Sequence, residues 1–505
     1  RVYGNAKISG DAQVSGDAWV TYQVINIITN SWAISFTNKI NIGCRAFTIE
    51  ELKQFAQSRI TNNTKFVGFG FPFEIWSDTI DEFISWIKKT WPKICIIWGS
   101  QIYPGFASVG YKDVDYYVVG YGEYALLSIM KVEFGNENRS SLKLDANWLL
   151  QKKIKLIDAI KTHPAYPLKS LSIKYEDRDF INAWEWLPIE FSRGCKFKCL
   201  FCNYPILGVK EDHTRSAEDL YNDLKENYDR FGVTNYTVAD ETVNDSIEKL
   251  RKYADQVERL NFTPWFSGFV RPDLLVSDPK QVDELMRLQF NGQFYGVETF
   301  NHKTGKIIRK GTDPEKISSK LLDVKDRFKK YNPREYRGTI SLILGLPYET
   351  RETLEKSLKW LETEWVGESY VTHSLRINKD EFADKLSDLD LNYAKYGYYD
   401  NGDFSEKFKS KYITSRISLR EKWANKLNWK NDNLSFEDVV EMENNFYFKN
   451  FENKTFGTSC WFLGDAMLAT FDLDEALKIR SITLDMLLES ANLMFTEYKI
   501  KKLNI

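Results

Sequence analysis

Three cysteines lie close together in the segment RGCKFKCLFC, which spans residues 193–202. Cys195, Cys199 and Cys202 are separated by three residues and then by two. Thiolates are soft ligands for iron, and a cubane iron–sulfur cluster normally takes four of them. A loop with three thiolates can bind three irons of one cube and leave the fourth iron open to an outside ligand. The spacing therefore predicts an iron–sulfur cluster with one position reserved for substrate chemistry.

Two other chemistries remain open for this segment. A zinc site could recruit a distant histidine or Cys460 as its fourth ligand, although zinc sites usually arrange their cysteines as two C-x2-4-C pairs. Cys199 and Cys202 also form a C-x-x-C pair of the kind that exchanges thiol and disulfide, but this interpretation leaves Cys195 without a role.

The composition sets outer limits on the function. The chain has 505 residues, of which 43% are hydrophobic and 28% charged, so it can build sizeable cores in more than one domain. Lys and Arg total 69 against 71 for Asp and Glu, which gives no indication of a nucleic-acid partner. Six cysteines are too few for a disulfide scaffold, and no apolar run reaches the length of a membrane span. We therefore expect a reduced, cytoplasmic protein.

Strand-like and helix-like segments alternate in two parts of the chain, which predicts an α/β fold with parallel sheets. The first part, 63–135, is expected to form a small Rossmann-like domain. Its predicted strands are 65–71, 94–100 and 116–122, and its predicted helices are 79–91 and 123–134. The second part, 187–380, contains six predicted strands at 187–193, 236–240, 263–269, 292–299, 338–346 and 371–377. Six such units predict a barrel, closed or partial, with its site in the loops that follow the strands.

Three further regions complete the predicted organisation. Residues 136–186 are irregular and are interpreted as a linker, and residues 381–505 are predicted to form a helical C-terminal region. Within residues 1–57, the segment RVYGNAKISGDAQVSGDAWV repeats Val or Ile, Gly and Ala every six positions. It resembles hexapeptide-repeat proteins of the left-handed β-helix type. The resemblance implies a remnant of a solenoid with its closing segment, or a piece through which the chain forms an oligomer.

The cysteine segment resembles the C-x3-C-x2-C signature of the radical S-adenosylmethionine (radical SAM) superfamily, and Phe201 occupies the aromatic position before its last cysteine. The resemblance implies a partial (β/α)6 barrel over residues 187–380. It also implies a [4Fe–4S] cluster on Cys195, Cys199 and Cys202, whose open iron binds S-adenosylmethionine. In this superfamily an electron from the cluster cleaves S-adenosylmethionine, and the 5′-deoxyadenosyl radical takes a hydrogen atom from the substrate.

The same resemblance assigns cofactor-binding roles to residues at the ends of the next strands. VADETVND, at 238–245, stands where the superfamily binds the methionine ammonium, so Asp240 and Glu241 are the candidates. Arg271 in GFVRPDLL is the corresponding candidate for the methionine carboxylate.

Two later strands carry the remaining candidates. FYGVETF resembles a GIE-type strand, which implies that Glu298 reaches the ribose hydroxyls. ISLILGLPYET resembles the glycine-rich fifth strand, whose backbone near Gly345 would meet adenine. Carboxylates and glycines at strand ends are also common in structural roles.

The domain before the barrel resembles the cobalamin-binding domain found in one subgroup of the superfamily. VGYGEYAL, at 119–126, matches a G-x-G-E segment, so Gly120 and Gly122 are candidates for contact with a flat ligand. No histidine lies within 65–134, so a histidine ligand to cobalt from this domain is not expected. Two alternatives remain: a domain that binds cobalamin, and a relic domain that only packs against the barrel.

These expectations combine into an enzyme whose substrate and catalytic residues are unknown. With cobalamin, the reaction would be methyl transfer to an unactivated carbon or phosphorus. Without it, epimerisation or rearrangement remains open, and a non-catalytic assembly protein driven by the β-helix segment is the competing class. The expected partners are a small-molecule, lipid or peptide substrate and a reductase or an electron donor of the flavodoxin or ferredoxin type.

Overall fold

The computed structural model describes the chain in segments. These are residues 39–42, 45–48, 53–54, 56–57, 60, 64–71, 78–100, 113–146, 149–150, 153–164, 168, 175, 183, 186–202, 204, 213–310, 313–332, 335–378, 387–412 and 426–452. The hexapeptide repeat in residues 1–20 lies outside them. From the predicted 1–57 segment, the structure describes one antiparallel pair of strands, β1 (Lys39–Ile42) and β2 (Arg45–Thr48).

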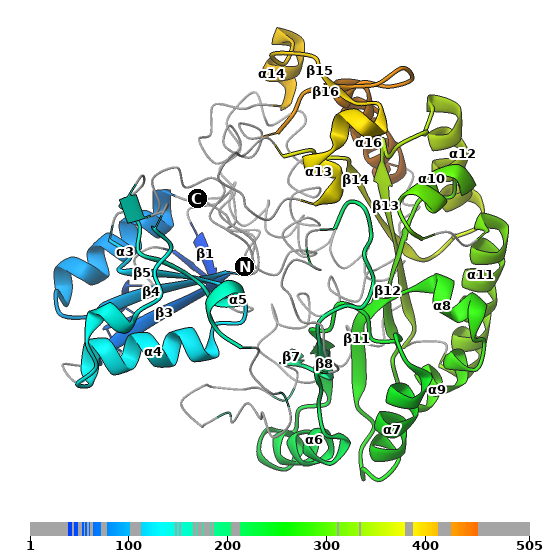
Figure 1. Ribbon diagram of the computed structural model, residues 1–505. Coiled ribbons are helices and arrows are strands. Elements are labelled where there is room, and N and C mark those ends of the chain that lie inside the picture. Colours follow the sequence, from blue (N-terminus) through cyan, green and yellow to red (C-terminus); the bar gives the residue numbers. More distant parts are fainter. Residues whose placement is uncertain are drawn as a thin grey trace, which may run out of the picture.

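A four-stranded parallel sheet forms the first α/β unit (Figure 1). Its strands, in spatial order, are β3 (Phe66–Phe71), β4 (Cys95–Ser100), β5 (Tyr116–Val119) and β6 (Leu156–Asp158). Its helices are α3 (Asp78–Thr90), α4 (Glu123–Phe134) and the short α5 (Ala159–Thr162). The interpretation of 136–186 as a linker is therefore wrong at β6, because residues 156–158 extend the sheet.

The two faces of this sheet are covered by different helices. Trp98 and Tyr117 pack in one buried cluster with Ile84 of α3, and Ile97 and Val118 pack in another with side chains of α4. Because successive residues of a strand point to opposite faces, α3 and α4 must lie on opposite sides of the sheet. This arrangement confirms the predicted Rossmann-like unit.

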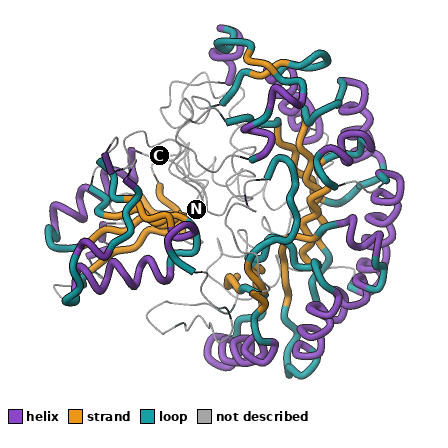
Figure 2. The backbone as a smooth tube through the Cα atoms, viewed as in Figure 1, coloured by secondary structure: helices purple, strands orange, loops and turns teal. Residues whose placement is uncertain are grey.

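A six-stranded parallel sheet forms the second α/β unit (Figures 1 and 2). Its strands, in chain order, are β7 (Trp186–Ile189), β10 (Asn235–Val238), β11 (Trp265–Val270), β12 (Gly292–Glu298), β13 (Arg337–Leu344) and β14 (Ser369–Ser374). The strands lie in space in the order in which they occur in the chain, with β7 and β14 at the two edges of the described sheet. The predicted partial (β/α)6 barrel is thus confirmed.

Helices cover the outer face of this sheet in an arc (Figure 2). They are α6 (Ala217–Phe231), α7 (Ile247–Val257), α8 (Pro272–Ser277), α9 (Gln281–Arg287), α10 (His302–Ile307), α11 (Pro314–Tyr331) and α12 (Arg351–Thr363). Local sequence sets where these helices begin and end. Ser216 caps α6 by accepting a hydrogen bond from the Asp219 amide, and Gly232 ends it in the left-handed conformation with φ of 72°. Pro314 follows the N-cap Asp313 as the first residue of α11.

The described part of the C-terminal region is helical for most of its length. It contains the helices α13 (Asp388–Leu391), α14 (Glu406–Tyr412) and α16 (Phe436–Glu452), and the 3-10 helix Tyr393–Tyr396. The helical prediction misses one antiparallel pair of strands, β15 (Tyr399–Asp400) and β16 (Trp429–Lys430). In α16, Phe446 contacts the ring of Tyr370, so this helix packs on β14 at the edge of the sheet.

Among the residues that the structure describes, every helix is too short or too polar to cross a lipid bilayer.

We predict that Tyr253→Phe destabilises the barrel by about 1–3 kcal/mol, because it removes a buried donor. The Tyr253 hydroxyl donates to the carbonyl oxygens of Phe191 and Arg215, at 2.7 and 2.9 Å, just before and after the cysteine loop. Urea denaturation would measure the change in the free energy of unfolding. Tyr331→Phe is the matched control, because it removes only an exposed hydrogen bond, which the Tyr331 hydroxyl accepts from Gln289 at 3.1 Å. Equal stability of the two variants would contradict the prediction.

Candidate functional site

The cysteine loop begins where the first barrel strand ends. A short antiparallel pair, β8 (Ser192–Arg193) and β9 (His213–Thr214), brings its two ends together. Leu200 is fully buried in the middle of the loop, and its amide donates to the carbonyl of Ile308 at 3.2 Å. The loop is therefore attached to the barrel both at its ends and at its centre.

Each of the three sulfurs has a polar neighbour from the protein. The Arg271 guanidinium donates to Cys199 Sγ at 3.3 Å, and the Tyr204 amide donates to Cys202 Sγ at 3.4 Å. Cys195 Sγ lies 3.8 Å from Thr242 Oγ1. Hydrogen bonds to the ligating sulfurs are among the groups that tune iron–sulfur clusters. The surroundings of the thiols therefore fit thiolate ligands.

The thiol of Cys202 lies in surroundings that disfavour its charged form. Burial raises the pKa of Cys202 to about 12, and Cys199 and Cys195 add to the increase through their charges. A thiol with this pKa becomes a thiolate when it binds a metal.

Within the described segments, no three Cys, His, Asp or Glu residues surround one point closely enough for a single metal ion.

Asp240 lies in a buried position at the end of β10. Its two oxygens accept hydrogen bonds from the Phe191 amide at 2.7 Å and from the Ser192 hydroxyl at 2.6 Å. Burial raises the pKa of Asp240, while Lys249, 3.7 Å away, favours the charged form. The structure therefore shows Asp240 holding the backbone that precedes the cysteines, with both of its oxygens already in use.

Glu241, its neighbour, faces the other end of the cysteine loop. Its carboxyl is hydrogen-bonded to the side chain of Tyr204, and burial raises its pKa to about 8. A cation beside this carboxyl would lower the pKa again and favour the carboxylate. Of the two predicted carboxylates, Glu241 is the one that remains suited to an ammonium group.

Arg271 follows β11 and contacts the cysteine loop directly. Besides Cys199, it pairs with Asp273 at 2.7 Å, and its guanidinium lies 3.8 Å from the centre of the Phe197 ring. Phe201 is partly buried and packs against the barrel core. The structure therefore brings Arg271, Phe201 and the three cysteines together.

Glu298 ends β12 with φ of 67°, a left-handed conformation that is uncommon for residues other than glycine. Its carboxylate pairs with Lys310 Nζ at 2.9 Å.

Gly345 follows β13 with φ of 91°. Both its amide and its carbonyl form hydrogen bonds with other groups of the protein. Its amide donates to Glu349 Oε2 at 2.8 Å, and its carbonyl accepts from the Tyr398 hydroxyl at 2.7 Å. A Cβ atom at Gly345 would lie 2.7 Å from the Trp429 ring, so glycine allows the C-terminal region to pack closely there.

Gly120 and Gly122 follow β5 in the first α/β unit. Gly120 has φ of 91°, and a Cβ atom there would lie 2.4 Å from the Ile160 side chain. Gly122 precedes the first residue of α4. Their positions at the carboxyl end of a parallel strand are where ligands bind in open α/β sheets.

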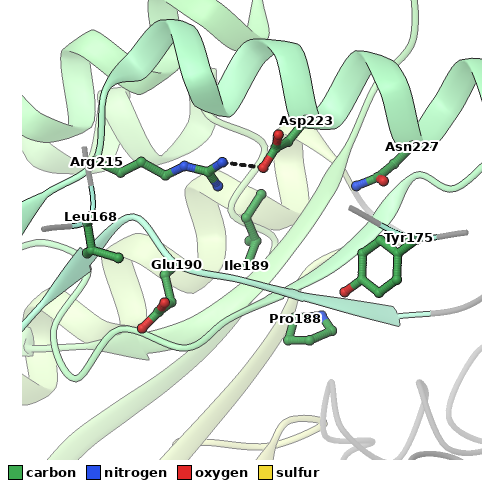
Figure 3. Close-up of a pocket in the computed structure, with 8 residues that line it drawn as sticks. All are labelled: Leu168, Tyr175, Pro188, Ile189, Glu190, Arg215, Asp223 and Asn227. Atoms are coloured by element: carbon green, nitrogen blue, oxygen red, sulfur yellow. Dashed lines mark hydrogen bonds and ion pairs between the residues drawn. The ribbon is translucent and has the colours of Figure 1, made fainter. Parts of the chain in front are cut away.

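A pocket between β7 and α6 is lined by residues other than the predicted site residues (Figure 3). Arg215 pairs with Asp223 there, and Asn227, from the same helix, also lines it. None of its eight lining residues is a predicted ligand of the cluster or of S-adenosylmethionine.

Sequence patterns did not reveal four residues that surround the cysteine loop: Tyr121, Arg193, Tyr204 and Lys249. Arg193 and Tyr204 flank the cysteines in sequence, which is a signal that could have been used. Tyr121 and Lys249 are distant in sequence, and only the fold brings them to the loop.

Comparison with known proteins gives the class of the barrel. Residues 189–361 match the sequence profile of the Radical SAM superfamily. A protein of Methanocaldococcus jannaschii, provisionally named a methylthiotransferase, is 24% identical over 252 residues. That alignment covers 48% of this chain and 53% of the relative, so this chain matches about half of the relative's length.

A solved structure extends the similarity in fold beyond the barrel. The radical S-adenosylmethionine methyltransferase TsrM from Kitasatospora setae, with cobalamin and a [4Fe–4S] cluster bound, matches with a TM-score of 0.57 at 12% identity. The match covers 87% of this chain and 91% of TsrM. At this identity the similarity concerns the fold.

The barrel of this chain is thus a radical SAM domain, the catalytic domain of an enzyme superfamily. The cofactors that such a domain implies are a [4Fe–4S] cluster and S-adenosylmethionine.

We predict that Glu349→Gln changes how stability depends on pH. Burial raises the pKa of Glu349 to about 7, while hydrogen bonds from Thr299 and from the Gly345 and Leu346 amides oppose the rise. The native state therefore binds more protons than the unfolded state between about pH 4.5 and 7, and wild-type stability falls as pH rises through this window.

A glutamine keeps an oxygen for the two amides and a donor for the Thr299 hydroxyl, but it does not titrate. The stability of Glu349→Gln relative to the wild type should rise with pH, by on the order of 3 kcal/mol across the window. Urea denaturation at pH 5 and pH 8 would measure the change. A constant difference between the two proteins at both pH values would show that Glu349 does not titrate in this range.

Proposed function

We propose that this chain binds a [4Fe–4S] cluster through Cys195, Cys199 and Cys202 and cleaves S-adenosylmethionine reductively to modify a substrate by radical chemistry. The observation that carries the proposal is the set of three thiols on one loop, each with its own polar neighbour. When bound, the cluster supplies the electron for cleavage and an open iron for the methionine group.

The protein's own residues would hold S-adenosylmethionine at the ends of the strands. Glu241 would accept the methionine ammonium, because its partly buried carboxyl lies beside Tyr204 of the loop and gains stability from a nearby cation. Arg271 would bind the methionine carboxylate through guanidinium donors that it can turn from Asp273. Glu298 would have to exchange part of its contact with Lys310 for the ribose hydroxyls, and the Gly345 turn would meet adenine only after local rearrangement.

Cobalamin-dependent methyl transfer is the reaction class that we favour. Two features support it: a doubly wound sheet precedes the barrel, and its strand β5 ends in a turn at Gly120 with φ of 91°, at the edge of the sheet where ligands bind in such folds. The TsrM match in fold extends over both α/β units. A non-methylating epimerase or rearrangement enzyme with a relic domain is the second candidate. The proposed partners are a substrate, which is a small molecule, a lipid or a peptide, and an electron donor of the flavodoxin or ferredoxin type.

Anaerobic reconstitution with iron and sulfide tests the cluster. The wild-type chain should show a cluster spectrum and form 5′-deoxyadenosine from S-adenosylmethionine and a reductant. Cys195→Ala, Cys199→Ala and Cys202→Ala should each abolish that product, because each removes one of three ligands. Cys95→Ala, a change at a buried cysteine of β4, is the control and should keep both signals. A wild-type chain without a cluster would favour an assembly protein, and one that takes up zinc instead would favour a zinc site.

Cobalamin binding is tested separately on the reconstituted protein. We expect the full chain to retain hydroxocobalamin through gel filtration, with the cobalamin absorbance eluting together with the protein. Retention would agree with methyl transfer. A chain that forms 5′-deoxyadenosine but retains no cobalamin would contradict methyl transfer and favour the non-methylating enzyme.

A further inference from the structure

We infer that residues 121–123 of the first α/β unit hold both ends of the cysteine loop and thereby set the electrostatic environment and retention of its cluster. This inference rests on the proposed function, because it assigns positioning roles to Tyr121 and Glu123 around the proposed cluster site. It gives the G-x-G-E segment a task that does not depend on cobalamin.

The first contact is at the start of the loop, two residues before Cys195. The Arg193 guanidinium pairs with the carboxylate of Glu123 across the two units. It also donates two hydrogen bonds to Glu190, both at 2.8 Å, and its charged group lies 4.7 Å from the centre of the Tyr121 ring. The side chain of Arg193 is only 10% exposed, so its charge depends on these partners for compensation.

The second contact lies after the last of the three cysteines, two residues beyond Cys202. The hydroxyl groups of Tyr121 and Tyr204 are 2.5 Å apart and share a hydrogen bond. The backbone amide of Tyr204 in turn donates to Cys202 Sγ. The hydroxyl of Tyr121 is therefore one side chain away from a ligand of the proposed cluster.

Polar contacts of this kind differ from simple packing between two domains. A relic domain could cover the barrel with apolar side chains alone, and it would not need a carboxylate opposite a buried guanidinium. Tyr121 and Glu123 are two positions apart, yet they reach loop residues that are eleven positions apart. One short segment thus acts on both flanks of the cysteines.

Two effects on the cluster follow from these contacts. Glu123 places a negative charge beside the guanidinium that lies nearest Cys195 in sequence. Its loss leaves more positive charge near the cluster, which favours the reduced, more negative state. The Tyr121 hydroxyl limits the motion of Tyr204, so its loss should let the end of the loop open more often.

The experiment compares Glu123→Gln and Tyr121→Phe in the reconstituted full-length chain. Glu123→Gln should shift the midpoint potential of the cluster to more positive values, as measured by a redox titration followed by electron paramagnetic resonance. Tyr121→Phe should speed cluster loss to an iron chelator about threefold to tenfold, the range expected for one hydrogen bond. Tyr204→Phe removes the same hydrogen bond and also the contact with Glu241, so its effect should be at least as large, and the double variant should add little to Tyr204→Phe.

Matched controls separate these effects from general damage. Glu137→Gln removes a carboxylate from an exposed pair with Lys131, and Tyr331→Phe removes an exposed hydrogen bond with Gln289, so both should behave as the wild type. Glu123→Asp keeps the charge and should return the potential toward the wild-type value. If Glu123→Gln does not fold, Arg193→Gln removes the same contact from the barrel side. Because Arg193→Gln removes a positive charge, it should shift the midpoint potential to more negative values.

The outcomes distinguish this inference from the proposed function. A wild-type chain that forms no cluster contradicts the proposed function itself. A wild-type chain that holds its cluster, with Glu123→Gln and Tyr121→Phe equal to their controls, overturns only the inference. A shift of the same size in Glu123→Asp and Glu123→Gln would also overturn it, because charge would then not be the cause.

Discussion

One buried carboxylate determines where the cysteine loop starts. Asp240 accepts hydrogen bonds from the Phe191 amide and the Ser192 hydroxyl, and Lys249 compensates its charge from α7. Lys249 also donates to Ser192 Oγ at 2.9 Å. These contacts join the end of β7 to the end of β10, so the backbone enters the loop in one direction. Without these contacts, the cysteine loop would lose one of the attachments that fix the position of its first residues.

Much of this fold could be predicted from the sequence, because its signals are local. Apolar segments bounded by turn residues marked the barrel strands to within a few residues. The strand β6 was missed because three residues are too few to show a period. The roles of the carboxylates were harder to predict. Sequence places Asp240 and Glu241 side by side, and only the fold shows that the first is fully engaged while the second faces Tyr204.

The C-terminal region changes what the barrel end can bind. Tyr398 donates to the carbonyl of Gly345, and the Trp429 ring occupies the space beside that glycine. Glu443 of α16 accepts a hydrogen bond from the Ser374 amide at 2.9 Å, at the end of β14. These contacts make the C-terminal region part of the wall around the last two strands. A nucleotide bound near Gly345 would therefore meet side chains that the resemblance to the superfamily alone would not supply.

The same physical argument connects the two α/β units. Burying a guanidinium costs free energy unless carboxylates replace its lost hydration. Arg193 has two such carboxylates: Glu190, which follows β7, and Glu123, which belongs to the first unit. Separating the units would leave Arg193 with one partner and would break the Tyr121–Tyr204 hydrogen bond at the same time. The charge balance at the start of the loop and the hydrogen bond at its end thus depend on one interface. A ligand that bound beside Gly120 and moved Tyr121 would also act on Tyr204, whose amide donates to Cys202 Sγ.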